Sequence, residues 1–255
     1  YASYVIRDRA IPDLEDGLKP VQRRIMHTLF EVDDGYFQKV SFVVGRTMKY
    51  HPHGDASIYG ALVNLANKEI FIEKQGNFGN KFTGDGASAG RYIECRVHPL
   101  AKDFLVTNPH ITNYVPNYDG RDKEPEVYRA KIPLVLIMGA EGIAVGMSTK
   151  ILPYNIREVL DAEIKCLKGE MAEDVEEVVL SLAINMMKLA GVGRDLTANK
   201  LKCLEVIKNG KALEKLKELV AKQGGDISYI DNPEKFEKAP IIMPVIAKQE
   251  GYVSE

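Results

Sequence analysis

The sequence lacks tryptophan and has only three cysteines among its 255 residues. Cys95, Cys166 and Cys203 stand far apart and form no C-x-x-C pair, which argues against a structural zinc site and for a reducing compartment. The longest apolar run, residues 132–146, is interrupted by proline, glycine and glutamate, so we expect no membrane-spanning helix. No signal peptide is evident, and a first residue other than Met indicates a fragment.

An excess of charge of one sign is also lacking, since the formal net charge is -2 at pH 7. A bulk polycation is therefore excluded, and any binding of nucleic acid must depend on local patches. The hydrophobic content of 45% excludes a disordered chain and is sufficient for a real core.

The cationic residues divide the chain into two parts. Residues 1–161 carry 10 Arg and 10 Lys, whereas residues 162–255 carry 1 Arg and 13 Lys. All five His and most of the Tyr and Phe residues also fall in the first part. Because arginine makes planar, bidentate contacts with phosphate and lysine acts as a solvated point charge, the first part predicts a binding surface and the second a helical body.

Hydrophobic spacing predicts the main elements of the first part. Apolar residues recur at helical spacing over residues 18–29 and again over residues 58–65, where Asp55 is the expected N-cap. The glycine-rich residues 78–90 predict a loop. Residues 92–97 predict a short strand or a helix start, and residues 106–150 are rich in turns and β-formers.

The second part predicts three helices, near residues 175–189, 201–207 and 213–220. Asn209-Gly210 and Gly224-Gly225 are expected to close the last two of them. Beyond the helices, we expect an extended run between Pro240 and Pro244 and the start of a strand at residues 251–253.

Residues 49–55, which read Lys-Tyr-His-Pro-His-Gly-Asp, place three potential cations ahead of a helix N-terminus. Backbone N–H groups and the helix dipole favour an anion there, which predicts a phosphate site. Two neighbouring His residues also fit a metal site, but no nearby Cys or carboxylate cluster completes one. A third interpretation is that these are ordinary loop residues and that Asp55 is only a cap.

Arg91-Tyr92 follows the glycine-rich loop. A tyrosine hydroxyl has a pKa of about 10 and is a poor nucleophile unless a cation stabilises the developing phenolate, as an adjacent arginine can. On spacing alone the pair is weak evidence, because most tyrosines are packing residues.

Together these segments resemble the A subunits of bacterial type IIA DNA topoisomerases, which are gyrase and topoisomerase IV. The motifs occur in the family's order and spacing from residue 1 to about residue 161. They lie at residues 9–13, 16–24, 49–55, 75–79, 91–92, 117–120 and 142–147. Residues 83–90 are more similar to topoisomerase IV than to gyrase.

The resemblance implies an α+β fold, with a winged-helix breakage-reunion domain over residues 1–105 and a truncated tower domain over residues 106–161. It implies that Tyr92 attacks a DNA phosphodiester and becomes joined to the 5′ phosphate, while Arg91 steadies the charge. It also implies that Ile143 wedges between base pairs and bends the duplex. The implied DNA-binding residues are Arg9, Lys19, Arg23, Arg24, Lys49, His51, His53 and Ile143.

The partners implied are double-stranded DNA, a second copy of the chain in a homodimer, and a topoisomerase B subunit. The implied location is the nucleoid in the bacterial cytoplasm. Mg²⁺ and ATP are expected mainly on the B subunit, because this chain has neither a matching carboxylate cluster nor a Walker-type loop. We therefore assign no metal ligand here, and expect no DNA relaxation by the chain alone.

Four positions depart from the family pattern. Gln22 replaces a common His, and Phe42 replaces a frequent Arg. Ala56 and Gly60 occupy the positions of the Ser and the acidic residue that anchor quinolones in many members. We therefore expect weak quinolone sensitivity.

Residues 162–255 resemble pyrimidine-nucleoside (thymidine) phosphorylases instead. The stretches that carry this resemblance are residues 186–191, 206–214, 221–226 and 251–255. That family's phosphate loop and base-binding residues lie upstream of the matching region, which implies a helical segment without catalytic residues in a composite chain. Two alternatives to a topoisomerase fragment remain: a DNA-binding fragment without catalysis and, less favoured, a phosphorylase-related protein.

Overall fold

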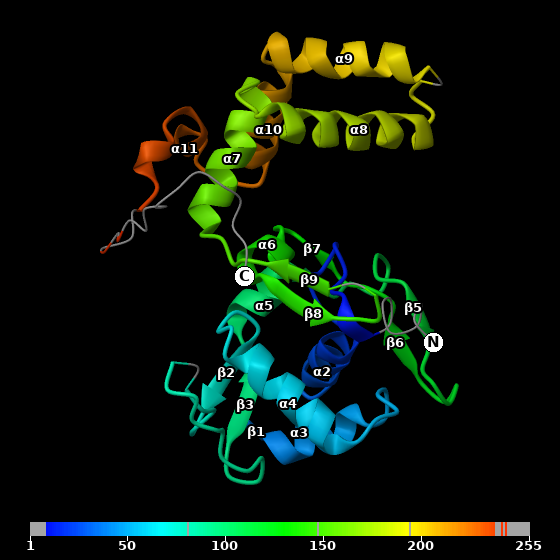
Figure 1. Cartoon of the computed structure of the whole chain (residues 1–255), viewed down its shortest axis with the longest axis vertical. Coiled ribbons are helices and arrows are strands. Elements are labelled where there is room, and N and C mark those ends of the chain that lie inside the picture. The colour runs from blue at the N-terminus through cyan, green and yellow to red at the C-terminus, as the bar shows by residue number, and fades with distance from the viewer. Residues whose placement is uncertain are drawn as a thin grey trace. The chain divides into compact units, whose positions relative to one another are not determined.

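The computed structural model describes residues 9–80, 82–146, 148–193, 195–237, 241 and 243. The chain divides into two compact units, Tyr1–Asn155 and Ile156–Glu255 (Figure 1). The expected boundary between residues 161 and 162 falls inside one continuous helix, α7 (Ile156–Lys168), so the structure places the division earlier. No helix among the described residues is long and apolar enough to cross a membrane.

Three helices pack against a small sheet at the start of the first unit. The helices are α2 (Pro20–Glu31), α3 (Val40–Thr47) and α4 (Asp55–Ala66). The antiparallel sheet has the order β1-β3-β2, from β1 (Gln38–Lys39), β2 (Ile72–Gln75) and β3 (Glu94–Val97). The apolar residues that predicted α2 and α4 form the core, where Ile25, Leu29 and Leu62 are almost completely buried.

Both predicted helices are confirmed, but the start of α4 differs from expectation. The N-cap is Gly54, without a side-chain cap hydrogen bond, and Asp55 is the first helical residue. The Asp55 carboxylate accepts a hydrogen bond from the adjacent Ala56 N–H, at 2.9 Å. Its negative charge still lies in the first turn, where the helix dipole favours it.

In the described part of the first unit, two short helices and three antiparallel strand pairs follow, in agreement with the expected β-rich segment. The helices are α5 (Pro99–Phe104) and α6 (Leu134–Met138). The pairs are β4 (Leu105–Val106) with β7 (Arg129–Ala130), β5 (Tyr114–Pro116) with β6 (Lys123–Pro125), and β8 (Ala140–Ile143) with β9 (Ser148–Ile151).

A glycine brings the turn before α2 against α6. Gly17 has a φ of 67°, which L-residues rarely adopt, and a Cβ there would lie 2.8 Å from the backbone nitrogen of Val135. The close approach places the beginning of α2 beside the β8–β9 region, where the candidate site lies.

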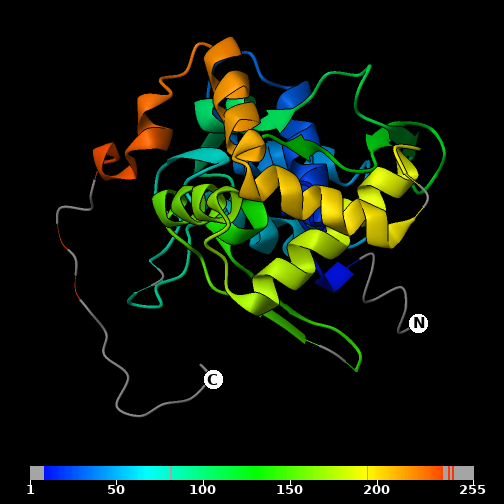
Figure 2. The same ribbon diagram turned by 90° about the horizontal axis from the view of Figure 1, so that it is seen from above.

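The described part of the second unit is helical. It contains α7, α8 (Glu173–Leu189), α9 (Leu196–Lys208), α10 (Lys211–Lys222), α11 (Ser228–Asp231) and the 3₁₀ turn η2 (Pro233–Lys235). Figures 1 and 2 both show α8 and α9 side by side. The three predicted helices are confirmed, whereas the extended run at residues 240–244 and the strand at 251–253 fall largely or wholly outside the described residues.

Candidate nucleic-acid interface

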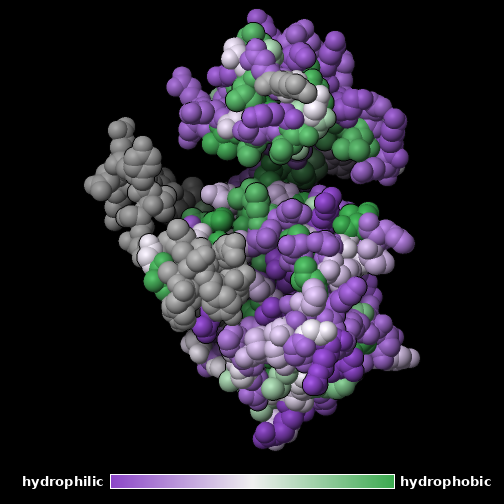
Figure 3. Space-filling view, turned by 90° about the vertical axis from the view of Figure 1, so that its right-hand side faces the viewer, coloured by the Kyte–Doolittle hydropathy of each residue, from purple (hydrophilic) through white to green (hydrophobic). Residues whose placement is uncertain are grey.

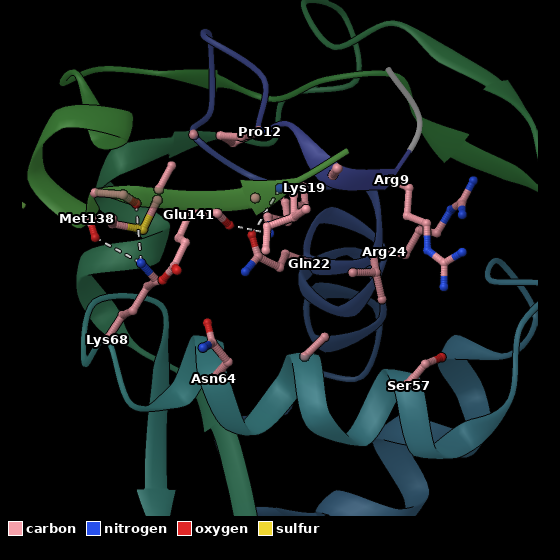
Figure 4. A pocket seen from close by; sticks show the side chains of 18 of the residues that line it. Arg9, Pro12, Lys19, Gln22, Arg24, Ser57, Asn64, Lys68, Met138 and Glu141 are labelled. Carbon is pink, nitrogen blue, oxygen red and sulfur yellow. Dashed lines mark hydrogen bonds between the residues drawn. The ribbon is translucent and has the colours of Figure 1, made fainter. Parts of the chain in front are cut away.

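A cavity of about 750 Å³ lies in the first unit, lined by α2, α4 and the β8–β9 hairpin. In Figure 4, Asn64 and Lys68 point into it from the α4 side, and Arg9 and Arg24 lie at its other end. Six of the eight predicted DNA-binding residues line it: Arg9, Lys19, Arg24, His51, His53 and Ile143.

Two lysines connect the walls of the cavity. Lys19 Nζ donates to the Glu141 carbonyl oxygen at 2.6 Å, which joins the start of α2 to β8. Lys68 Nζ donates to the carbonyl oxygens of Met138 (2.9 Å) and Gly139 (3.3 Å), just beyond α4. Sequence reasoning missed Lys68 and Glu141. Lys68 bonds to carbonyl groups about seventy residues further along the chain, and no local pattern distinguishes such a lysine from a solvated one.

Arg24 contacts His51 at the end of the cavity that His51 and His53 line. Its Nε and one terminal nitrogen donate to the Glu124 carboxylate at 2.6 and 2.8 Å, and the other terminal nitrogen lies 3.1 Å from His51 Nδ1. Because arginine can only donate, we infer that His51 Nδ1 accepts and that Nε2 carries the proton. Arg24 thereby fixes the orientation of His51.

His51 is uncharged near neutral pH. Burial lowers its pKa to about 4, and the positive charges of Arg24 and Arg9 act in the same direction. The ring of His53 lies 4.8 Å from the ring of His51, centroid to centroid. His51 can therefore offer a phosphate a neutral N–H donor rather than a positive charge.

Arg23 does not belong to this surface, although we expected it to bind DNA. Its guanidinium donates to both oxygens of the buried Asp16 carboxylate, at 2.6 and 2.9 Å, and the residue is only 7% exposed. Asp16 also accepts hydrogen bonds from the backbone N–H groups of Leu18 and Tyr128. Arg23 therefore stabilises the fold at the start of α2, where it is almost completely buried.

Lys49 is likewise held away from the cavity. Its Nζ lies 3.0 Å from the Asp122 carboxylate and 4.0 Å from that of Glu31. The hydrogen bond to Asp122 is the main cause that raises the pKa of Lys49. Lys49 does not line the cavity, and its charge is already paired with the turn after β5.

Ile143 stands at the end of β8 with 82% of its surface exposed. The preceding Gly142 lies so close to Ala10 that a Cβ would collide with the Ala10 carbonyl oxygen. Only glycine permits this approach, which sets the hairpin over the cavity. An aliphatic side chain presented this openly at a cavity rim is available for insertion into a partner.

Arg91 and Tyr92 lie in the turn before β3, and neither lines the cavity. The Arg91 guanidinium carbon is 4.6 Å from the centre of the Tyr92 ring, and the Tyr92 N–H donates to the Ala89 carbonyl oxygen at 2.9 Å. Tyr92 is 66% exposed. The expected nucleophile is therefore open to a large substrate and has a cation beside it.

The part of the chain that the structure describes contains no group of three or more His, Cys, Asp or Glu side chains placed to hold a metal ion. The pair His51 and His53 therefore has no third protein ligand of these types within that part.

Comparisons with known proteins identify relatives of the first unit and of the beginning of the second. Residues 9–183 match the family described as the A subunit of DNA gyrase/topoisomerase IV. The A subunit of DNA topoisomerase 4 from Borreliella burgdorferi is 66% identical over 170 residues, which are 67% of this chain and 27% of that protein. The DNA gyrase A subunit of Nocardioides sp. is 48% identical over 172 residues, which are 63% of this chain and 18% of that protein. The DNA gyrase A subunit of Staphylococcus epidermidis is 43% identical over 191 residues, which are 69% of this chain and 21% of that protein.

The chain thus spans 27% or less of the length of these relatives. The family match continues past residue 161 into α8. The comparisons give no support to the expected phosphorylase resemblance of residues 162–255.

Proposed function

Since the chain belongs to the family of DNA gyrase and topoisomerase IV A subunits, we propose that it is the region of such a protein that cleaves and rejoins double-stranded DNA. The observation that carries this proposal is the cavity, whose wall combines cations, two histidines and the exposed aliphatic side chains of Ile143 and Val145. Contacts to phosphates hold a duplex, and an inserted apolar side chain bends it. The identity of 66% to a topoisomerase 4 chain, compared with 48% to a gyrase chain, favours the topoisomerase IV branch.

In this proposal, Arg9, Lys19 and Arg24 neutralise backbone phosphates at the cavity. His51 Nε2 and the exposed His53 add hydrogen-bond donors at the Arg24 end of the cavity, just before the first residue of α4. The helices α2 to α4 and the sheet β1-β3-β2 form the winged-helix domain over residues 1–105, and the following strand pairs form a truncated tower domain.

Tyr92 supplies the nucleophile. Its oxygen forms a bond to a backbone phosphorus while the bond from that phosphorus to the 3′ oxygen breaks. The tyrosine hydroxyl releases its proton and the leaving 3′ oxygen takes one up to become a hydroxyl, so that the protein is joined through Tyr92 to the 5′ phosphate. Arg91, held beside the ring, stabilises the charge that develops. Attack by the freed 3′ hydroxyl reverses the reaction, and the ester conserves the bond energy for resealing.

The proposal also requires partners. Two copies of the chain hold one duplex as a homodimer, so that two Tyr92 residues cut its two strands. Following the family resemblance, we assign Mg²⁺ mainly, and ATP entirely, to the B subunit. The complex would act at the nucleoid in the cytoplasm.

Trapping of a covalent product tests the proposal. The chain is mixed with a topoisomerase B subunit, Mg²⁺, ATP and supercoiled DNA, and the reaction is stopped with SDS. We expect protein-linked, cleaved DNA that Tyr92→Phe abolishes and that Tyr36→Phe retains, since Tyr36 is also exposed, at 76%, but has no assigned role.

Other outcomes support the alternatives. DNA binding without covalent product from the parent chain would identify a non-catalytic DNA-binding fragment. Phosphate-dependent release of thymine from thymidine would support the phosphorylase-related alternative for residues 162–255.

A further inference from the structure

An exposed apolar stripe runs along the whole of α8 in the second unit. Its members are Val175 (47% exposed), Val178 (59%), Leu182 (60%), Met186 (69%) and Leu189 (88%). Figure 3 shows hydrophobic residues at the surface of this unit among hydrophilic ones. Five large aliphatic residues exposed on one helix are more than the scattered surface residues that need no explanation.

The stripe is distinct from the face of α8 that packs inside the unit. Leu180 and Ile184 are buried against Cys203 of α9, and at 100° per residue they lie on the side of α8 opposite Leu182. The helix therefore has two apolar faces, one used inside the unit and one without a partner among the described residues.

The stripe follows the three- and four-residue spacing of a helix-packing face over two heptads, with Met186 next to the second intervening heptad position, which is Asn185. Val175, Leu182 and Leu189 are seven residues apart, and Val178 lies at the intervening position. Sustained spacing of three and four residues allows one helix to pack along another with a slight supercoil. The stripe on the 17-residue helix is roughly 25 Å long at 1.5 Å per residue.

The charges beside the stripe favour a second copy in the antiparallel direction. Asp174, Ser181 and Lys188 are also seven residues apart and follow one edge of the stripe, and all three are exposed. When two copies of α8 run antiparallel about Ser181, the Asp174 of each copy faces the Lys188 of the other. A parallel pair would instead place like charges level with one another.

The helix dipole adds to this preference, because antiparallel helices bring the N-terminus of one beside the C-terminus of the other. The first turn of α8 carries Glu173, Asp174 and Glu176, and its last turn carries Lys188. We propose that α8 is a self-association surface, on which α8 of a second copy packs antiparallel through the stripe. This contact is independent of the DNA-binding cavity and of Tyr92.

Cysteine substitutions on the full chain test the geometry. Ser181 lies at the proposed two-fold axis, so Ser181→Cys should form a dimer with a short bis-maleimide, whereas the parent chain should not. Asp174→Cys and Lys188→Cys should give little dimer separately and a heterodimer when mixed. A dimer from Asp174→Cys alone, or no dimer from the mixture, would overturn the antiparallel arrangement.

A disruption experiment tests the surface itself. In the Ser181→Cys chain, Leu182→Asp introduces a charge in the middle of the stripe. The self-association measured by sedimentation should become weaker by about tenfold or more. The cross-linking yield should fall to a similar extent. Leu219→Asp is the matched control, since Leu219 on α10 is similarly exposed, at 53%, but lies outside the stripe.

Circular dichroism of both variants establishes that they are folded. The proposal would be refuted if the Ser181→Cys chain cross-linked equally well alone, with Leu182→Asp and with Leu219→Asp. Because cross-linking at Ser181 reports α8 alone, a failed cleavage assay would leave this result unchanged.

Discussion

Replacement of Arg23 by alanine should destabilise the first unit far more than it weakens DNA binding. In the folded chain the completely buried Asp16 carboxylate accepts two hydrogen bonds from Arg23 and two from backbone N–H groups. Arg23→Ala leaves that carboxylate buried without its counter-charge. Loss of one partner of such a pair costs about 3–5 kcal/mol, a large share of the roughly 5–15 kcal/mol that stabilises a typical domain.

Urea unfolding followed by tyrosine fluorescence measures this loss. The chain has no tryptophan, and all its tyrosines except Tyr229 and Tyr252 precede residue 156, so the signal comes mainly from the first unit. We expect the midpoint for Arg23→Ala to fall by roughly 2 M urea, given an m-value of about 2 kcal/mol/M.

Lys19→Ala is the matched control, because Lys19 lines the cavity. It should change the free energy of unfolding by only about 1 kcal/mol. It should lower the slope of log affinity for DNA against log salt concentration by roughly 0.9, the loss of one phosphate contact. An unchanged stability of Arg23→Ala together with a reduced salt slope would refute the structural role that we assign to Arg23.

Three further predictions concern the cavity and its surroundings. Ile143→Ala should leave the unfolding free energy nearly unchanged, because the side chain is exposed, but reduce DNA bending measured by energy transfer between the duplex ends; full bending would exclude the wedge. The folded-state pKa of His51, about 4, lies below the unfolded value of about 6.5. Its contribution to stability is therefore present above the unfolded pKa and is lost as the pH falls from about 6.5 towards about 4. His51→Asn, which retains an acceptor for Arg24, should make the loss of stability between pH 7 and pH 5 smaller, and an equal loss would contradict the assignment. The double replacement Ala56→Ser with Gly60→Glu should increase quinolone-stabilised cleavage. Both positions are exposed, and a Cβ at Gly60 meets no atom within 4 Å. Ordinary quinolone sensitivity of the parent chain would refute the expected weak response.

The helices could be predicted because their information is local. The recurrence of apolar residues identified α2, α4 and the three helices around residues 175–220, and the structure confirms them. The first residue of each helix was harder to predict from the sequence, since the N-cap of α4 is Gly54 and not Asp55. The change of composition near residue 161 falls within α7, because a change of composition need not coincide with the end of a helix.

The roles of individual cations could not be predicted, because they depend on distant partners. Arg23 and Arg24 are adjacent in a motif and look equivalent, yet Arg23 pairs with the buried Asp16 carboxylate, which also accepts a hydrogen bond from the backbone N–H of Tyr128, 112 residues away. Arg24 instead reaches Glu124, 100 residues away, and the rim of the cavity. Contacts between residues so far apart in the sequence leave no pattern in the local spacing of residue types.

The central claim is that the Tyr92 oxygen becomes bonded to a 5′ phosphate of DNA, and mass spectrometry of the trapped product tests it most directly. The SDS-trapped complex, formed by the chain on DNA in the presence of a B subunit, is digested with nuclease and protease, and the peptides are searched for an attached nucleotide. We expect a nucleotide joined through its 5′ phosphate to the peptide that contains Tyr92. A nucleotide on any other residue, or a linkage through the 3′ phosphate, would contradict the account.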